Sequence, residues 1–153
     1  MTKSRKGFTL IEILIAVGII AILAAIVIIA INPARQFQRA RDAQRWSDVN
    51  AILNSVHQRM VDNKGSFAEG TTCDALPAAA SYITSTVAAG NVDLCDCLVT
   101  TYLAALPFDP STSGAGFTDC SNYTTGYTVM QAATGRITVA APGDELDTIT
   151  VTR

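Results

Sequence analysis

An apolar run near the N-terminus constrains this chain more than any other feature. Residues 8–31 contain a single ionisable side chain, Glu12. An α-helix rises about 1.5 Å per residue, so this run is long enough to cross the roughly 30 Å hydrocarbon core of a bilayer. Lys3, Arg5 and Lys6 precede it, with no acidic residue among them. The pattern predicts a membrane-spanning helix over residues 8–31.

Glu12 argues that this helix is more than a plain anchor. A carboxylate inside a bilayer costs roughly 2.5–3.5 kcal/mol on insertion scales, so an intramembrane acid indicates a function. A secretory signal peptide would also carry a small-residue cleavage site after its apolar region. Here the run is followed by Asn32, Pro33 and Ala34 instead.

Residues 6–12 read KGFTLIE, and they follow a basic leader and open an apolar helix. This stretch resembles the class III signal of type IV pilins and of the related pseudopilins of type II secretion. The resemblance implies that a membrane peptidase cuts after Gly7 and that the new N-terminal residue, Phe8, is N-methylated. It further implies that Glu12 pairs with the Phe8 amine of a neighbouring subunit and sets the axial register of a helical filament.

The chemistry of this pairing is physically reasonable. After cleavage Phe8 carries a positively charged amine, and Glu12 lies one helical turn further along. A low dielectric strengthens such a pair and makes an unpaired charge costly. The pair can form within one chain or between two chains, and the resemblance implies the second arrangement.

A second, amphipathic helical segment is predicted over residues 32–65. Proline removes a helix hydrogen bond and disfavours helical geometry in the preceding residue, so Asn32–Pro33 predicts a kink. Apolar residues then recur every three or four positions, and Gly65 is placed to end the helix. This apolar face consists of Phe37, Ala40, Ala43, Trp46, Val49, Ile52, Leu53, Val56 and Met60. Phe37 and Trp46 are expected in the core or at a subunit interface, and the single histidine, His57, in packing or at the surface.

Four arginines stand on the second segment: Arg35, Arg39, Arg41 and Arg45. They are expected either to form a solvated helix face or to meet acidic heads or lipid phosphates when subunits pack. Three basic residues precede the apolar run and four follow it, so the positive-inside rule weakly favours the reverse orientation. The leader outweighs this charge count, because the peptidase of the resembled family acts on the cytoplasmic side.

Residues 66–153 are predicted to form a globular head. Short helices are expected near residues 77–83 and over 92–106, with a loop over 111–123. Alternating runs at 126–131, 136–140 and 148–152, separated by Gly or Pro turns, predict a three-stranded antiparallel sheet. The predicted fold is therefore α+β, in which the amphipathic second half of a long N-terminal helix packs on a small antiparallel sheet.

Four cysteines, Cys73, Cys95, Cys97 and Cys120, lie in the head. A head on the extracytoplasmic side suits disulfides. A bond between Cys95 and Cys97 is disfavoured by strain. The remaining pairings are 73–95 with 97–120, or 73–97 with 95–120. A zinc site is the weaker alternative, because Cys-x-Cys with single distant partners is not a zinc-finger spacing.

Other kinds of chemistry have little support in the sequence. Asp109 and Asp119 are weak calcium candidates suggested by the resemblance to major pseudopilins, although their loop lacks dense acidic spacing and both residues can simply start turns. The sequence carries no nucleophile motif and no phosphate-binding loop, so no catalytic site or cofactor is predicted. Nine acids and two bases follow Gly65, which argues against nucleic-acid binding by the head.

Together these features predict a structural subunit of a type IV pilus-like surface filament, and the alternative is a major pseudopilin of a type II secretion system. The expected organisation is a cleaved leader over 1–7, a membrane and filament-core helix over 8–31, its amphipathic continuation over 32–65, and the head. The expected partners are further copies of the chain, a prepilin peptidase/N-methyltransferase, an inner-membrane assembly platform and, before assembly, membrane lipid. The head is expected outside the cytoplasmic membrane and, after assembly, at the cell surface.

Overall fold

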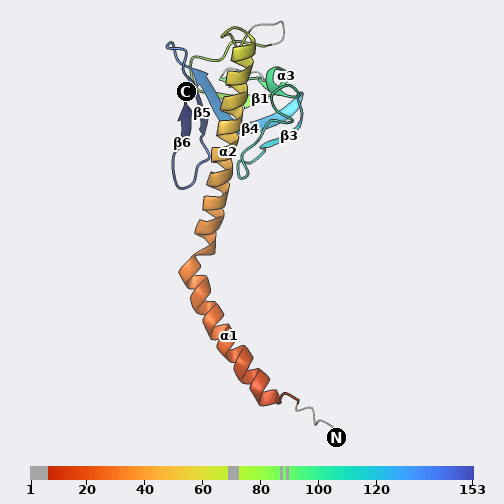
Figure 1. Ribbon diagram of the computed structural model, residues 1–153, viewed down its shortest axis with the longest axis vertical. Coiled ribbons are helices and arrows are strands. Elements are labelled where there is room, and N and C mark those ends of the chain that lie inside the picture. The colour runs from red at the N-terminus through yellow and green to blue at the C-terminus, as the bar shows by residue number, and fades with distance from the viewer. Residues whose placement is uncertain (1–6, 69–72, 87, 89) are drawn as a thin grey trace. The chain divides into compact units, whose positions relative to one another are not determined.

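Two long helices come first in the chain and a β-sheet follows, which confirms the predicted α+β fold (Figure 1). The computed structural model describes residues 7–68, 73–86, 88 and 90–153. The chain divides into two compact units, Met1–Phe37 and Gln38–Arg153, so the boundary falls inside the second helix. The basic leader residues Lys3, Arg5 and Lys6 lie outside the described residues.

In the first unit, helix α1 spans Leu10–Ile31 and ends at a left-handed residue, Asn32, with φ 48°. Helix α2 (Pro33–Asp62) begins at the next residue. Helical structure therefore resumes at once, as predicted, after a one-residue interruption at Asn32. The Asn32 carbonyl accepts hydrogen bonds from the Arg35 and Gln36 amides, so it already serves the first turn of α2, where Pro33 has no N–H to offer.

The sheet of the second unit has six strands within the described part of the chain. They are β1 (Ser81–Thr84), β2 (Asn91–Val92), β3 (Gly116–Asp119), β4 (Asn122–Gln131), β5 (Ile137–Ala141) and β6 (Ile149–Thr152). The main order is β2-β1-β4-β5-β6, with β3 paired to β4. The predicted three-stranded meander corresponds to β4, β5 and β6, and β4 begins four residues earlier than expected.

The core of the second unit forms where α2 crosses one face of this sheet (Figure 1). Val49, Ile52, Leu53 and Val56 of α2 are fully buried. They pack with the apolar side chains that alternate along the C-terminal strands, namely Tyr127, Val129, Ile137, Val139 and Ile149. The predicted faces of the helix and of the strands therefore meet, which is how period 3.6 and period 2 patterns build a two-layer core.

Two predicted helices in the head are wrong. The segment near residues 77–83 instead contributes β1, which pairs antiparallel with β4. Of the helix predicted over 92–106, only α3 (Cys95–Leu98) exists, because Val99 is extended and Thr100 has a φ of 71°. The leucines at 94, 98 and 106 are buried as their spacing suggests, but Leu94 precedes α3, Leu98 is its last residue and Leu106 lies in the irregular segment further along.

The end of α2 differs slightly from the prediction. Lys64 occupies the left-handed position that ends the helix, with φ 56°, and Gly65 follows with φ 96°. The Gly65 amide donates to the Met60 carbonyl at 2.7 Å, which is the longer-range of the two hydrogen bonds of a Schellman motif. Glycine thus stands one position after the residue that closes the helix.

Phe37 and Trp46 do not belong to the core, because 65% and 40% of their surfaces are exposed. In this part of α2 the buried residues are instead Asp42 and Arg45. His57 is partly buried, and its Nδ1 lies 2.8 Å from the Leu53 carbonyl oxygen one turn earlier. This contact is consistent with the packing or surface position expected for it.

Candidate assembly site

The predicted cleavage site lies outside the helix. Gly7, Phe8 and Thr9 are non-helical and exposed, and Phe8 exposes 81% of its surface. A Cβ added at Gly7 would meet no atom within 4 Å, so the fold itself gives no steric reason for glycine there. The Gly7–Phe8 peptide bond is therefore accessible at the surface of the structure.

Thr9 caps α1. Its Oγ1 accepts a hydrogen bond from the Glu12 amide at 3.3 Å, and its carbonyl accepts from the Ile13 amide at the same distance. A Thr followed three residues later by Glu is the pattern of a capping box, a signal that is already present in the sequence. The cap means that the helix starts just after the predicted cleavage site and holds Glu12 in its first turn.

Glu12 is exposed, and its carboxylate has no hydrogen bond or ion pair within the described residues. The helix N-terminus favours a negative charge by a few tenths of a kcal/mol to about 1 kcal/mol. That contribution is smaller than the roughly 2.5–3.5 kcal/mol cost of placing a carboxylate in a bilayer. In a bilayer, Glu12 would therefore be stabilised by a cationic partner that the described residues do not supply.

The surface of α1 is apolar all round, and none of its 22 residues is buried. The helix is long and apolar enough to cross a membrane, which fits membrane anchoring. A helix that is hydrophobic on every side is stable only when lipid or other helices surround it. Glycine costs about 1 kcal/mol relative to alanine in a helix. No side-chain contact within this chain requires glycine at position 18, so packing within the chain does not explain Gly18.

The second unit contains a buried ion network that the sequence pattern does not reveal. Arg45 of α2 has no exposed surface. Its Nε and Nη2 donate to the two carboxylate oxygens of Asp109 at 2.7 and 3.1 Å, and its Nη1 donates to Asp42 at 2.6 Å. Glu145 accepts from Arg45 at 3.3 Å and from Arg41 Nη2 at 2.6 Å. Arg41 and Arg45 therefore bind acids of their own head instead of standing on a fully solvated helix face.

The network joins three chain segments that are far apart in sequence. Asp42 accepts hydrogen bonds from the amides of Glu145 and Leu146, in the loop between β5 and β6. Asp109 accepts from the amides of Ser111 and Thr112 in the loop before β3. Each carboxylate thus fixes a loop and balances the guanidinium at the same time, which is the condition under which a buried charge is tolerated.

Hydrogen bonds within this network favour the ionised forms of its acidic and basic side chains. Burial alone would raise the pKa of Asp109, but the hydrogen bonds from Arg45 and from two backbone amides lower it to about 2. The hydrogen bond from Arg41 lowers the pKa of Glu145 to about 2 as well. Conversely, the bond to Asp109 raises the pKa of Arg45 above its usual value. All of these groups are ionised at neutral pH.

The two calcium candidates are not brought together. Both carboxylate oxygens of Asp109 are engaged by Arg45, while Asp119 accepts a hydrogen bond from the Ser121 amide in the turn between β3 and β4. In the part of the chain that the structure describes, no three His, Cys, Asp or Glu side chains are grouped so as to hold a metal ion. The Arg45 guanidinium therefore binds the carboxylate oxygens that Asp109 would have to offer to a calcium ion.

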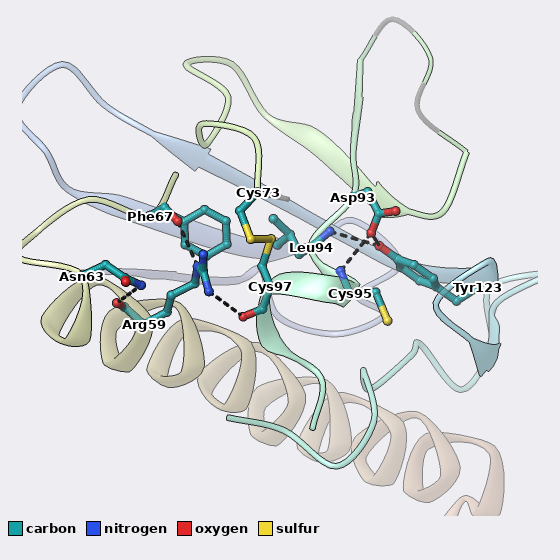
Figure 2. Close-up of a disulfide and its surroundings, with 9 residues drawn as sticks. All are labelled: Arg59, Asn63, Phe67, Cys73, Asp93, Leu94, Cys95, Cys97 and Tyr123. Atoms are coloured by element: carbon teal, nitrogen blue, oxygen red, sulfur yellow. Dashed lines mark hydrogen bonds between the residues drawn. A yellow bond between two sulfur atoms is a disulfide. The ribbon is translucent and has the colours of Figure 1, made fainter. Parts of the chain in front are cut away.

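The four cysteines form two disulfides, Cys73–Cys97 and Cys95–Cys120, which is one of the two predicted pairings. Cys95 and Cys97 both lie on α3, so the two bridges hold this short helix from two directions. Figure 2 shows the surroundings of the first bridge, where Arg59 of α2 donates to the carbonyls of Cys97 and Phe67 at 3.2 and 2.9 Å. The bridges and the Arg59 contacts together connect α2, α3 and the hairpin of β3 and β4.

Tyr123 supports the same region from the sheet. Its hydroxyl donates to Asp93 at 2.6 Å and accepts from the Leu94 amide at 3.1 Å (Figure 2). Asp93 also accepts from the Cys95 amide two residues later, which is the hydrogen bond of an Asx turn leading into α3. Burial and the bond to Asp93 raise the pKa of Tyr123, which therefore stays protonated as a donor at neutral pH.

A family comparison agrees with the geometry of the first unit. Residues 2–31 match the model of the prokaryotic N-terminal methylation motif. This match and the capped apolar helix establish a type IV pilin-like prepilin leader. The match is confined to this N-terminal part of the chain. Comparisons with curated proteins and with solved structures give no significant match.

Proposed function

We propose that this chain is a structural subunit of a type IV pilus-like surface filament and has no catalytic activity of its own. A prepilin peptidase cuts after Gly7, and Phe8 is N-methylated. The subunit then waits in the cytoplasmic membrane with its head on the extracytoplasmic side. An inner-membrane assembly platform passes it into a filament with a core of packed α1 helices.

A single observation carries this proposal. The only ionisable group on a fully exposed apolar helix, Glu12, has no partner within the described residues and lies one turn after the predicted new N-terminus. In a bundle of such helices the Phe8 amine of one subunit can neutralise Glu12 of the next. The pairing removes the cost of both unpaired charges, and it forms at one relative height of two neighbouring helices. It therefore sets the axial step of the filament.

The head provides the reason for preferring a pilus over a secretion pseudopilus. Two disulfides brace it, as suits a subunit exposed for long periods outside the cell. A calcium site would favour the major pseudopilin, but Asp109 is occupied by Arg45. These two features support the pilus, and the pseudopilin is the alternative outcome of the test.

The test is a deletion of the gene in the native host, followed by complementation. We expect the deletion strain to lose filaments that can be sheared from the cell surface, while protein secretion into the medium continues. The sheared filaments of the complemented strain should contain a subunit whose N-terminus is methylated Phe8. Loss of secretion without any loss of surface filaments would contradict the pilus and identify a pseudopilin. A subunit that retains its leader would contradict both.

A further inference from the structure

The segment that follows α1 has the properties of a membrane-interface segment. Helix α1 has 22 residues and is thus roughly 33 Å long at about 1.5 Å per residue. This length matches the hydrocarbon core, so the residues directly after Ile31 reach the level of the lipid headgroups. Those residues are Asn32 to Phe37, the last part of the first unit.

Several backbone groups of this segment are hydrogen-bonded within the segment itself. The Gln36 side chain donates to the Ile31 carbonyl at 3.3 Å, and Asn32 accepts from the Arg35 and Gln36 amides through its carbonyl. Backbone groups near a bilayer need such partners because hydrocarbon offers none. The helix interruption can therefore sit at the membrane surface without help from another chain.

In contrast to the backbone groups, the Arg35 and Phe37 side chains of this segment are exposed. Arg35 is exposed, and its guanidinium has no hydrogen bond or ion pair within the described residues. In contrast, Arg41 and Arg45 are bound to acids of the head. Phe37 exposes 65% of its surface. The last turn of α1 contains no basic residue, so Arg35 is the first cation after the apolar run.

We propose that the Arg35 guanidinium binds a phosphate of an anionic lipid at the membrane face where α1 ends, with the Phe37 ring in the same interfacial layer. Guanidinium forms paired hydrogen bonds to phosphate, and aromatic and basic residues together are typical of interfacial segments. The contact fixes the depth at which the subunit waits before assembly. This inference rests on the membrane stage of the proposed function.

The test uses the full-length chain reconstituted into nanodiscs of equal parts phosphatidylglycerol and phosphatidylcholine. Lipids that stay bound to the released protein are counted by native mass spectrometry. We expect the wild type to retain phosphatidylglycerol preferentially. Arg35→Gln should weaken this preference about fivefold, the change that one basic residue near an anionic surface produces. Arg35→Lys should keep part of it, because the charge remains while the planar fork is lost.

Arg39→Gln is the matched control, since it removes an equal charge from an exposed position one turn further along α2. We expect less than a twofold effect from it, and excess inorganic phosphate should not displace the retained lipid. Equal effects of the two variants, or no effect of Arg35→Gln, would overturn the proposal. Unchanged lipid retention combined with a lower filament yield for Arg35→Gln would also overturn it, because Arg35 would then serve a neighbouring subunit. The nanodiscs hold no filament, so the lipid result stands apart from the test of the pilus.

Discussion

The two carboxylates Glu12 and Asp109 show how differently the two units of this chain are built. Glu12 lies on a helix with no buried residue and has no partner within the described residues. Asp109 is buried, and both of its oxygens bind Arg45. The head pairs its buried charges internally, whereas α1 leaves its charge and all its apolar surface for other molecules. The head is therefore a complete fold by itself, whereas α1 needs lipid or other copies of the chain around its apolar surface.

A substitution of Arg45 gives the strongest test of the buried ion network in the head. We expect Arg45→Met to destabilise the head by roughly 3–5 kcal/mol, because it leaves Asp42 and Asp109 as buried carboxylates without their cation. Denaturant unfolding of the full chain in detergent, followed by the fluorescence of the single tryptophan, Trp46, measures this change. Arg39→Met is the control, and we expect it to change the unfolding free energy by less than about 0.5 kcal/mol. Equal stabilities of the two variants would show that the network does not hold the head together.

The disulfides give the next largest effect. Replacing either bonded pair by serines, Cys73 with Cys97 or Cys95 with Cys120, should cost about 2–4 kcal/mol. The mismatched pair Cys73→Ser/Cys95→Ser should cost more than either, because it removes both bridges of the observed pairing. Peptide mapping after alkylation without reductant checks the bonds directly. A peptide joining Cys73 to Cys95 would contradict the structure.

Lowering the pH should weaken the ion network and change the stability of the head, with a smaller effect than the substitutions above. The pKa of Glu145 is lowered to about 2 by Arg41, from an ordinary value near 4.3. A lowered folded-state pKa means that the contribution is fully present above the ordinary value and is lost as the pH falls toward 2. We therefore expect wild type to be more stable than Arg41→Gln at pH 6, and the difference to shrink between about pH 4 and pH 2. A difference that does not change with pH would contradict the assigned pairing.

Long, regular patterns are what make an element predictable from this sequence. Residues 10–31 are recognisable as a helix because nearly every side chain is apolar, and β4 to β6 as strands because alternation continues over several residues. The strands β1, β2 and β3 have two to four residues and consist mainly of small or polar side chains, so their formation depends on pairing with β4 or β1 rather than on a local pattern. Such tertiary pairing cannot be read from one short segment.

The ion network escapes prediction for a different reason. Arginine is normally a surface residue, so the pattern alone assigns Arg45 to a polar face. Its position contains a usable signal, since Asp42, Arg45, Val49 and Ile52 are three or four residues apart and share one side of the helix. The acids that complete the network, Asp109 and Glu145, come from loops far along the chain. Likewise, the disulfide pairing depends on how α3 is oriented, which the spacing of the cysteines leaves open.

The central claim is that α1 is completed by other subunits through Glu12, and a Glu12→Gln variant tests it most directly. It is expressed in the native host without wild type, and sheared filaments are compared with membrane-held subunit. We predict normal cleavage after Gly7 and a stable subunit in the membrane. Filament yield should fall by about tenfold or more, because a buried amine without its partner costs roughly 3–5 kcal/mol. The control Ile11→Leu, which keeps the carboxylate, should assemble normally. A normal yield of filaments from Glu12→Gln would contradict the account.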